Sequence, residues 1–170
     1  MAQISMEVPG DERGTLLAFV EAQRTALREA AQGLTEEQAA SRPSASELSL
    51  SGLLKHAAQC ELGWLRMAQG ATGPEEGQED AWADAFRLVG DETVPSVLAH
   101  WDEVRRETEA FILAVPSLDD SFPLPPAPWF PQDAKVSMRW MLLHLVEEFA
   151  RHAGHADIVR ETIDGTRAMG

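Results

Sequence analysis

The stretch EEFARHAGHADIVRE, residues 147–161, has helical periodicity but carries an acid and two imidazoles where a helix normally buries Leu or Val. At roughly 100° per residue, His152 falls near the centre of the apolar stripe, and Glu148 lies about 50° to one side. Glu148 and His152 are stacked one turn apart and His155 lies on the same side, so two or three of these groups can point at one atom. A buried ionised carboxylate is costly unless it is paired or bound to a metal.

On this helix alone, three explanations of the cluster stay open, one of which is a metal site. His152 can be an ordinary hydrogen-bonded core histidine, or Glu148 and His152 can neutralise each other across one turn, and neither explanation needs a metal. A ligand from another element would favour a metal site. His56, in LLKHAAQCELGWL, is the candidate because it lies beside Leu53 and Ala57 on a face that must meet the rest of the molecule. Taken alone, His56 is equally well explained as a half-buried residue at the edge of the core.

Four stretches carry helical periodicity, and none of comparable length alternates as a strand would, so the sequence predicts an all-α protein. Asp11, Ser49 and Ser137 are placed to begin three of the long helices, and Thr35 with Gln38 fits a capping box of a short turn. The four expected helices are residues 11–32, 49–69, 94–115 and 137–164. Helices of this length predict a four-helix bundle, as one domain over residues 1–170.

The segment from Phe122 to Val136 holds five prolines and cannot be helical. It is long for a bundle connection, so we expect it to cross the molecule or to cover part of it. Trp129 and Phe130 within it are expected to pack over an end of the bundle.

Composition restricts the partners. Lys and Arg total 14 against 28 Asp and Glu, a net charge of −14 that repels nucleic acid. A single cysteine, Cys60, excludes an intrachain disulfide and fits a reducing compartment. The N-terminus lacks the basic and apolar regions of a signal peptide, and the longest strongly apolar run, Trp140 to Val146, is far short of a membrane span. We therefore expect a soluble cytoplasmic protein.

The placement of LLKHAAQCE in the second long helix and EFARHAGHADIVRE in the last resembles the DinB-like superfamily of metal-binding bundles. The chain is particularly similar to the uncharacterised branch whose last helix carries an ARHAGHAD-type string, and the resemblance covers essentially the whole chain. It implies a four-helix bundle with a long crossing connection before the last helix. It also implies one divalent ion held by a helix-two histidine and an H-x-x-x-H pair. Some members are bacillithiol- or mycothiol-dependent S-transferases or the mycothiol-dependent maleylpyruvate isomerase, and bundles of this family often form homodimers.

Carried onto this chain, the resemblance assigns His56 and His152 as metal ligands and places Glu148 where the family has the first histidine of the pair. Two histidines and a carboxylate suit zinc above all, with nickel or ferrous iron as alternatives. His155 could be a fourth ligand, a catalytic acid or base, or a group that orients Glu148, and these roles stay open.

The other titratable residues are weaker candidates for a role in the site. Cys60 could bind a soft metal but is better explained as a small buried residue. Glu61 and Arg160 could neighbour the site or be ordinary paired charges. His144 would compete as a ligand if the last helix were rotated slightly.

Two further features are expected to be structural. His100 is expected at a helix boundary. The acidic loop from Glu75 to Asp80 lacks the spacing of an EF-hand and is expected to be solvated surface.

Two function hypotheses follow. The first is a metal-dependent enzyme that acts on a small-molecule substrate, with a low-molecular-weight thiol such as mycothiol implied by the resemblance. The second is a non-catalytic metal- or ligand-binding protein of a stress response. An open coordination position and thiol-dependent turnover favour the first, and a closed site favours the second.

Overall fold

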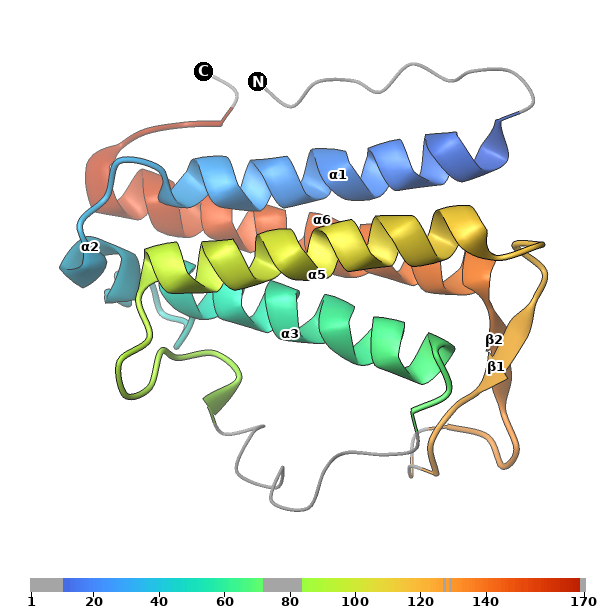
Figure 1. Cartoon of the computed structure of the whole chain (residues 1–170). Helices are drawn as coiled ribbons and strands as arrows, with labels where there is room; N and C mark the ends of the chain where they lie inside the picture. The colour runs from blue at the N-terminus through green and yellow to red at the C-terminus, as the bar shows by residue number, and fades with distance from the viewer. Residues whose placement is uncertain (1–10, 72–83, 127, 129, 169–170) are drawn as a thin grey trace.

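The structure is a computed structural model that describes residues 11–71, 84–126, 128 and 130–168. The elements, in chain order, are α1 (Glu12–Ala31), α2 (Glu36–Ala40), α3 (Leu50–Ala68), α5 (Val94–Ala114), β1 (Ser121–Pro123), β2 (Lys135–Ser137) and α6 (Met138–Asp164) (Figure 1). The acidic loop at residues 75–80 and Trp129 lie outside the described residues.

Side-chain caps begin the helices close to where the sequence predicts. The Asp11 carboxylate accepts from the backbone N–H of Gly14, and the Ser137 hydroxyl accepts from that of Trp140. Thr35 and the residue three positions later form a reciprocal capping box at α2. At the other end, Gly165 closes α6 with φ of 77°, a conformation that glycine adopts without the steric cost of a Cβ.

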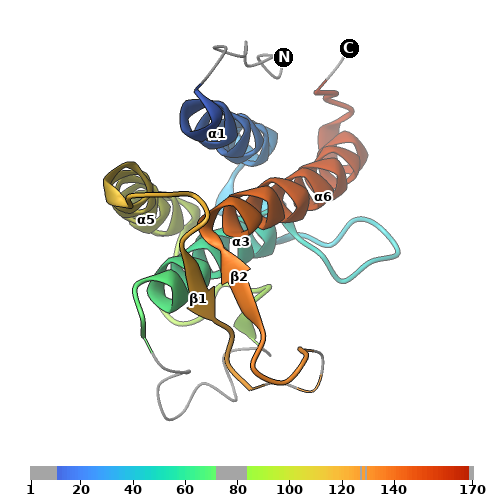
Figure 2. The ribbon, with the colours of Figure 1, turned by 90° about the vertical axis from the view of Figure 1, so that its right-hand side faces the viewer.

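The four long helices α1, α3, α5 and α6 surround one hydrophobic core (Figure 2). α1 packs most extensively against α6, and α3 packs against both α5 and α6. Trp101 of α5 and Phe149 of α6 meet edge to face at the centre, with ring centroids 5.6 Å apart. The prediction of a mostly helical protein is therefore confirmed. In the part of the chain that the structure describes, no helix is long and apolar enough to cross a membrane.

A buried ion pair ties three of these helices together. Both carboxylate oxygens of Glu61 on α3 accept from the guanidinium of Arg24 on α1, at 3.0 and 2.5 Å, and Trp101 Nε1 donates to the same carboxylate at 2.9 Å. Burial opposes the charge on Arg24, but the carboxylates of Glu61 and Glu21 together more than offset this and raise the pKa of Arg24. The carboxylate is thus satisfied inside the core.

The connection before α6 differs from the expectation. β1 and β2 pair antiparallel with Ser121 opposite Ser137, and α5 ends at the end of the bundle where α6 begins (Figure 1). The long crossing connection before the last helix, which the resemblance implies, is therefore wrong, and the other expectation for this segment, that it covers part of the molecule, is confirmed. Phe122 is buried there against Trp64, with centroids 6.5 Å apart, and Phe130 packs against the core as predicted.

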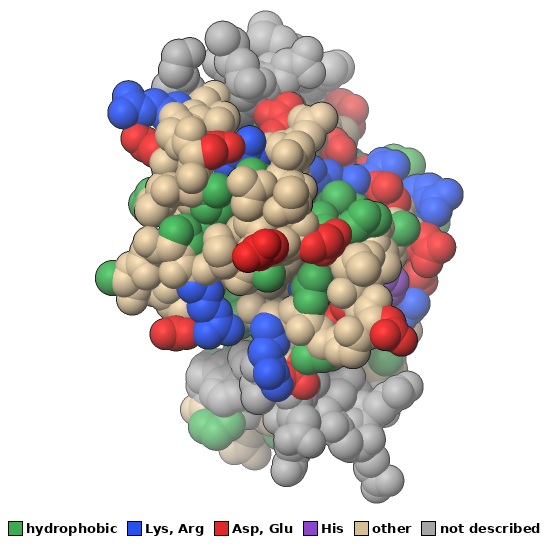
Figure 3. All heavy atoms as spheres, turned by 90° about the vertical axis from the view of Figure 1, so that its left-hand side faces the viewer, with side chains coloured by type: hydrophobic (Ala, Val, Ile, Leu, Met, Phe, Trp, Pro, Cys, Tyr) green, Lys and Arg blue, Asp and Glu red, His purple; other side chains and the backbone are tan. Residues whose placement is uncertain are grey.

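α3 and α5 both begin at the end of the bundle where α2 lies, whereas α6 begins at the opposite end (Figure 1). α3 therefore runs parallel to α5 and opposite to α6. The surface at the α2 end of the molecule carries acidic and basic side chains mixed together (Figure 3).

Candidate metal centre

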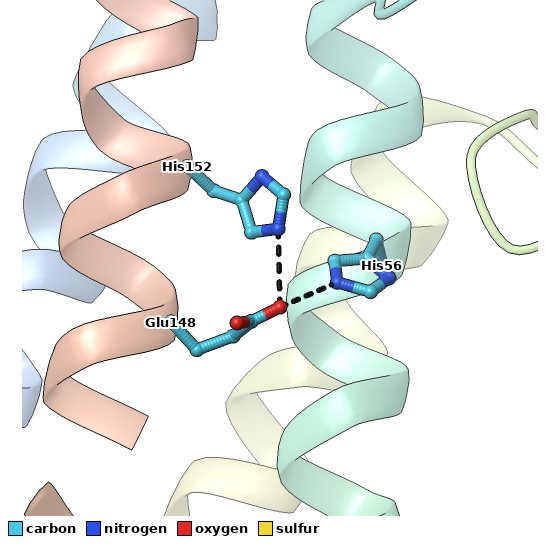
Figure 4. A group of neighbouring side chains, drawn as sticks. All are labelled: His56, Glu148 and His152. Atoms are coloured by element: carbon cyan, nitrogen blue, oxygen red, sulfur yellow. Dashed lines mark hydrogen bonds and ion pairs between the residues drawn. The ribbon is translucent and has the colours of Figure 1, made fainter. Parts of the chain in front are cut away.

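The three predicted ligands converge between α3 and α6 (Figure 4). His56 of α3 and His152 of α6 each place Nε2 3.1 Å from the same carboxylate oxygen, Oε1 of Glu148. One ligand atom from each of the three residues lies within 4.8 Å of the other two. Helical spacing alone relates only Glu148 and His152, and the packing of α3 against α6 adds His56 to the cluster.

The cluster lies at the edge of the buried face, as the periodicity of α6 predicts. The side chains of His56 and Glu148 are 18% and 17% exposed, whereas His152 is buried. At this depth, packing holds the three side chains in defined positions, and small molecules from solvent can still reach the cluster. This combination suits a site that exchanges small molecules.

The electrostatics favour a cation at this point. Hydrogen bonds with His152 and then His56 lower the pKa of Glu148 far below its usual range, although burial opposes this. The carboxylate is therefore ionised at neutral pH. It places a negative charge between two imidazole nitrogens.

The donor set fits a borderline divalent ion. Zinc binds imidazole nitrogen and carboxylate oxygen at about 2.0–2.2 Å, so ligand atoms around a tetrahedral ion are roughly 3.3 Å apart. Both nitrogen–oxygen distances of 3.1 Å are close to that value, and all three ligand atoms lie within 4.8 Å of one another, so the two histidines must move closer together to hold the ion. Three protein ligands also leave a coordination position for water or substrate.

His155 contacts a predicted ligand from behind. Its Nδ1 lies 3.4 Å from Nδ1 of His152, on the side of that ring away from Glu148. When the proton of His152 is on Nδ1, its Nε2 lone pair is free for a metal, and His155 Nδ1 can accept a hydrogen bond from that N–H. The contact therefore favours an orienting role, directed at His152 rather than at Glu148.

Sequence reasoning missed Phe86, which covers one side of the cluster. Its ring stacks on His56 with centroids 4.1 Å apart and an interplanar angle of 18°, and it lies 5.8 Å from the ring of His152. Phe86 therefore holds the His56 imidazole in place and shields both histidines on that side. Nothing in the local pattern around Phe86 signals this contact, because it depends on how the chain folds back onto α3.

Gly52 is what lets the Phe86 segment approach α3. A Cβ at Gly52 would lie 2.0 Å from the Phe86 carbonyl oxygen. The same segment is held by Lys55, whose Nζ donates to the Arg87 carbonyl at 3.0 Å and to the Glu92 carboxylate at 2.7 Å. A glycine inside a helical pattern was the available signal, since it often marks a close backbone approach.

The remaining candidates lie outside the three-residue cluster. Burial raises the pKa of the Cys60 thiol to about 12, with the charges of Glu148 and Glu61 adding to the shift. Cys60 is half-buried, so the interpretation of it as a small buried residue holds only in part. His144 stacks on Trp140, with centroids 5.0 Å apart, and does not join the ligand cluster.

The two charged residues considered as neighbours of the site have structural partners. Glu61 is paired with Arg24 in the core. Arg160 forms an ion pair with Asp164 and donates to the carbonyl oxygen of Ala30 at 2.9 Å. His100 is exposed in the second turn of α5, so the expectation that it lies at a helix boundary is wrong.

Fold and site together define a helical bundle with two histidines and a carboxylate facing one another between two of its helices. The chain matches the mycothiol-S-transferase family over residues 15–165 and belongs to that family. This confirms the resemblance to the DinB-like superfamily, of which the family is a part.

Comparison with solved structures supports the same fold. The crystal structure of a conserved protein from Enterococcus faecalis superposes with a TM-score of 0.65 at 14% sequence identity, over 95% of this chain and 100% of that one. At this identity the similarity shows the fold alone. No curated protein matches the chain.

Proposed function

We propose that this protein is a divalent-metal-dependent thiol S-transferase, with zinc as the first candidate ion and a low-molecular-weight thiol such as mycothiol as cosubstrate. The observation that carries the proposal is the convergence of His56 Nε2 and His152 Nε2 on Glu148 Oε1, at 3.1 Å each. Membership of the mycothiol-S-transferase family supports the choice of a thiol.

In this proposal, His56, His152 and Glu148 are the residues that would hold the ion. A bound divalent ion acts as a Lewis acid that lowers the pKa of a coordinated thiol, as it does for water. The Glu148 carboxylate offsets one of its two positive charges. Phe86 keeps water away from His56 on the side that it covers.

The reacting sulfur comes from the cosubstrate. Cys60 is the only cysteine of the chain, and burial keeps its thiol protonated at neutral pH. The cosubstrate sulfur forms a bond to an electrophilic carbon of the acceptor. The thiol proton goes to a base, and the acceptor either releases a leaving group or takes up a proton at the neighbouring carbon.

His155 has a place in the proposal in one of two roles. Its contact with His152 Nδ1 supports an orienting role. Its imidazole, partly exposed beside the cluster, can also serve as the acid or base that carries the thiol proton. The pH profile of turnover in His155→Gln separates them, because loss of an acid or base removes one limb of the profile.

The first test is elemental analysis of untagged protein purified without chelator or added metal, beside His152→Ala and Glu148→Ala. Near one equivalent of zinc, nickel or iron in the parent and little in the variants is expected. The parent is then assayed for metal-dependent conjugation of mycothiol with an electrophilic fluorophore such as monochlorobimane.

Two outcomes contradict the proposal. A parent that is empty and also fails to bind added metal removes the metal site. A metal-loaded parent that turns over no thiol favours a non-catalytic metal-binding protein instead. The homodimer stays a prediction, which size-exclusion chromatography with light scattering checks.

A further inference from the structure

Two rows of side chains face each other along the α3–α6 interface. Each row repeats every four residues, so its members lie one above another on one side of their helix. The row on α3 is His56, Cys60 and Trp64, and the row on α6 is Trp140, His144, Glu148 and His152. Because the two helices run in opposite directions, the ligand cluster forms at one end of this strip and aromatic residues meet at the other.

We call the aromatic end, made of Trp64, Trp140 and His144, the aromatic shelf. Trp140 and His144 stack with centroids 5.0 Å apart and an interplanar angle of 10°. Trp64 meets His144 edge-on at 4.8 Å and lies 5.3 Å from Trp140. Trp64 is buried, but Trp140 remains 40% exposed. The shelf is thus a preformed aromatic surface with a buried base and an accessible indole.

The shelf lies on the side of the ligand cluster that Phe86 leaves uncovered. Phe86 is held near Gly52, one turn before His56, whereas the shelf begins two turns after His56. Between the cluster and the shelf lies Cys60, a half-buried residue one turn after His56. A ligand that leaves the cluster in this direction meets the small Cys60 side chain and then aromatic rings.

The distance between the ligand cluster and the aromatic shelf sets the size of a molecule that can contact both. An α-helix rises about 1.5 Å per residue, so His144 and Trp140 lie about 6 and 12 Å along α6 from Glu148. A molecule with its reacting atom at the cluster can place a ring on the shelf through a short linker. Aromatic rings prefer offset-stacked or edge-to-face neighbours, and the shelf offers both.

We infer that the aromatic shelf is the subsite for a flat apolar group of the electrophilic acceptor. The acceptors are then aromatic or conjugated electrophiles, with the reactive carbon roughly one to two helical turns from the ring. This inference rests on the proposed function, since the reacting atom is placed at the His56, Glu148 and His152 cluster.

Hydroxamates test the subsite without any assay of turnover, because they chelate a metal that has open coordination positions. Zinc-loaded protein is titrated calorimetrically with acetohydroxamate and with 3-phenylpropionohydroxamate, which adds a ring on a two-carbon linker. The ring is expected to tighten binding by about tenfold, the effect of one favourable aromatic contact together with its buried area.

Three variants test which residue is responsible for the tighter binding of the ring-bearing hydroxamate. Trp140→Ala is expected to reduce the ring effect to less than about twofold while acetohydroxamate binds as in the parent, and Trp140→Phe is expected to keep most of it. Leu143→Ala is the matched control, because Leu143 is 51% exposed on the same helix but outside the row. It should keep the full effect.

The outcomes separate the two proposals. If acetohydroxamate fails to bind the zinc-loaded protein, the site is closed, and both the proposed function and the subsite are wrong. If acetohydroxamate binds but the ring adds nothing, or its effect survives Trp140→Ala, the subsite alone is wrong. A dimer that dissociates on Trp140→Ala, with the ring effect unchanged, would assign the shelf to contact between two copies of the chain.

Discussion

His56 Nε2 lies 3.1 Å from Glu148 Oε1 although 92 positions separate the two residues in the chain. The contact exists only while α3 and α6 pack against each other, because each residue is carried by a different helix. An ion bound here would therefore bind the folded protein and not the unfolded chain. Metal binding and bundle stability are thus coupled.

Zinc is therefore expected to stabilise the protein. Free zinc at a hundred times its dissociation constant adds about 2.7 kcal/mol to the free energy of unfolding. Thermal melts of chelator-treated protein, with and without zinc, measure the shift. Glu148→Ala should abolish it, and His100→Ala, which removes an exposed histidine of α5, should leave it intact. A shift that persists in Glu148→Ala would place the zinc elsewhere.

His155→Ala is expected to weaken zinc binding by about 10- to 100-fold, because partners that orient a metal-binding histidine typically contribute that much. The physical reason is the loss of the group 3.4 Å from His152 Nδ1, which leaves the tautomer of His152 unfixed. Competition with a chromophoric chelator measures the affinity, and His155→Gln should recover part of it. An unchanged affinity in His155→Ala would leave only the acid–base role.

Gly52→Ala is expected to destabilise the protein by about 1–3 kcal/mol, as overpacking of a close contact does. Its new Cβ would lie 2.0 Å from the Phe86 carbonyl oxygen and would displace the ring that stacks on His56. Zinc affinity should fall as well. Urea unfolding of the metal-free protein and a zinc titration measure the two effects.

Gly63→Ala in the same helix is the matched control for Gly52→Ala. A Cβ at Gly63 meets nothing within 4 Å, so the substitution should stabilise α3 by about 0.5–1 kcal/mol and leave zinc affinity unchanged. Equal effects of the two substitutions would contradict the close approach at Gly52.

The helices and the ligand cluster could be predicted because their signals are local. Caps such as Asp11 and Ser137 act within one turn, and Glu148 and His152 share a face by helical spacing alone. His56 could be predicted as a third member of the cluster because the buried face of its helix had to pack against another helix. The cluster therefore followed from three positions on two amphipathic helices.

The parts that the sequence did not predict depend on contacts between distant segments. The strands around Phe122 and Val136 have three residues each, too few to show alternation, so the β1–β2 pair was missed, although covering by this segment was one of the two expectations. Phe86 carries no local signal of its stacking on His56. The partner of Glu61 was equally hidden, because Arg24 lies 37 positions away on another helix.

Glu61→Leu is expected to cost about 3–5 kcal/mol of stability, because it leaves the Arg24 guanidinium buried without its main partner. The double variant Arg24→Met with Glu61→Leu should recover much of this loss, since it removes both charges from the core. Urea unfolding of the parent, the single variants Glu61→Leu and Arg24→Met, and the double variant completes the double-mutant cycle. A single variant as stable as the parent would show that the ion pair contributes little.

Cys60 is expected to resist alkylation in the folded protein. Burial raises the pKa of its thiol to about 12, so at pH 8.5 only about one molecule in 3 × 10³ carries the reactive thiolate. Iodoacetamide at pH 8.5, read by mass spectrometry, should modify the urea-unfolded chain within minutes and the folded chain far more slowly. Equal rates in the two states would show an accessible thiol.

The same shift makes stability depend on pH in the alkaline range. The unfolded thiol loses its proton near its ordinary pKa of about 8.5, while the folded thiol keeps it until about 12. The folded state therefore binds more protons between these values, so stability falls as pH rises from about 8.5 to 12 and is unaffected by Cys60 below that window. Urea unfolding of metal-free protein at pH 8 and pH 10.5 should show a smaller loss in Cys60→Ala than in the parent. Identical losses would mean that the thiol ionises equally in both states.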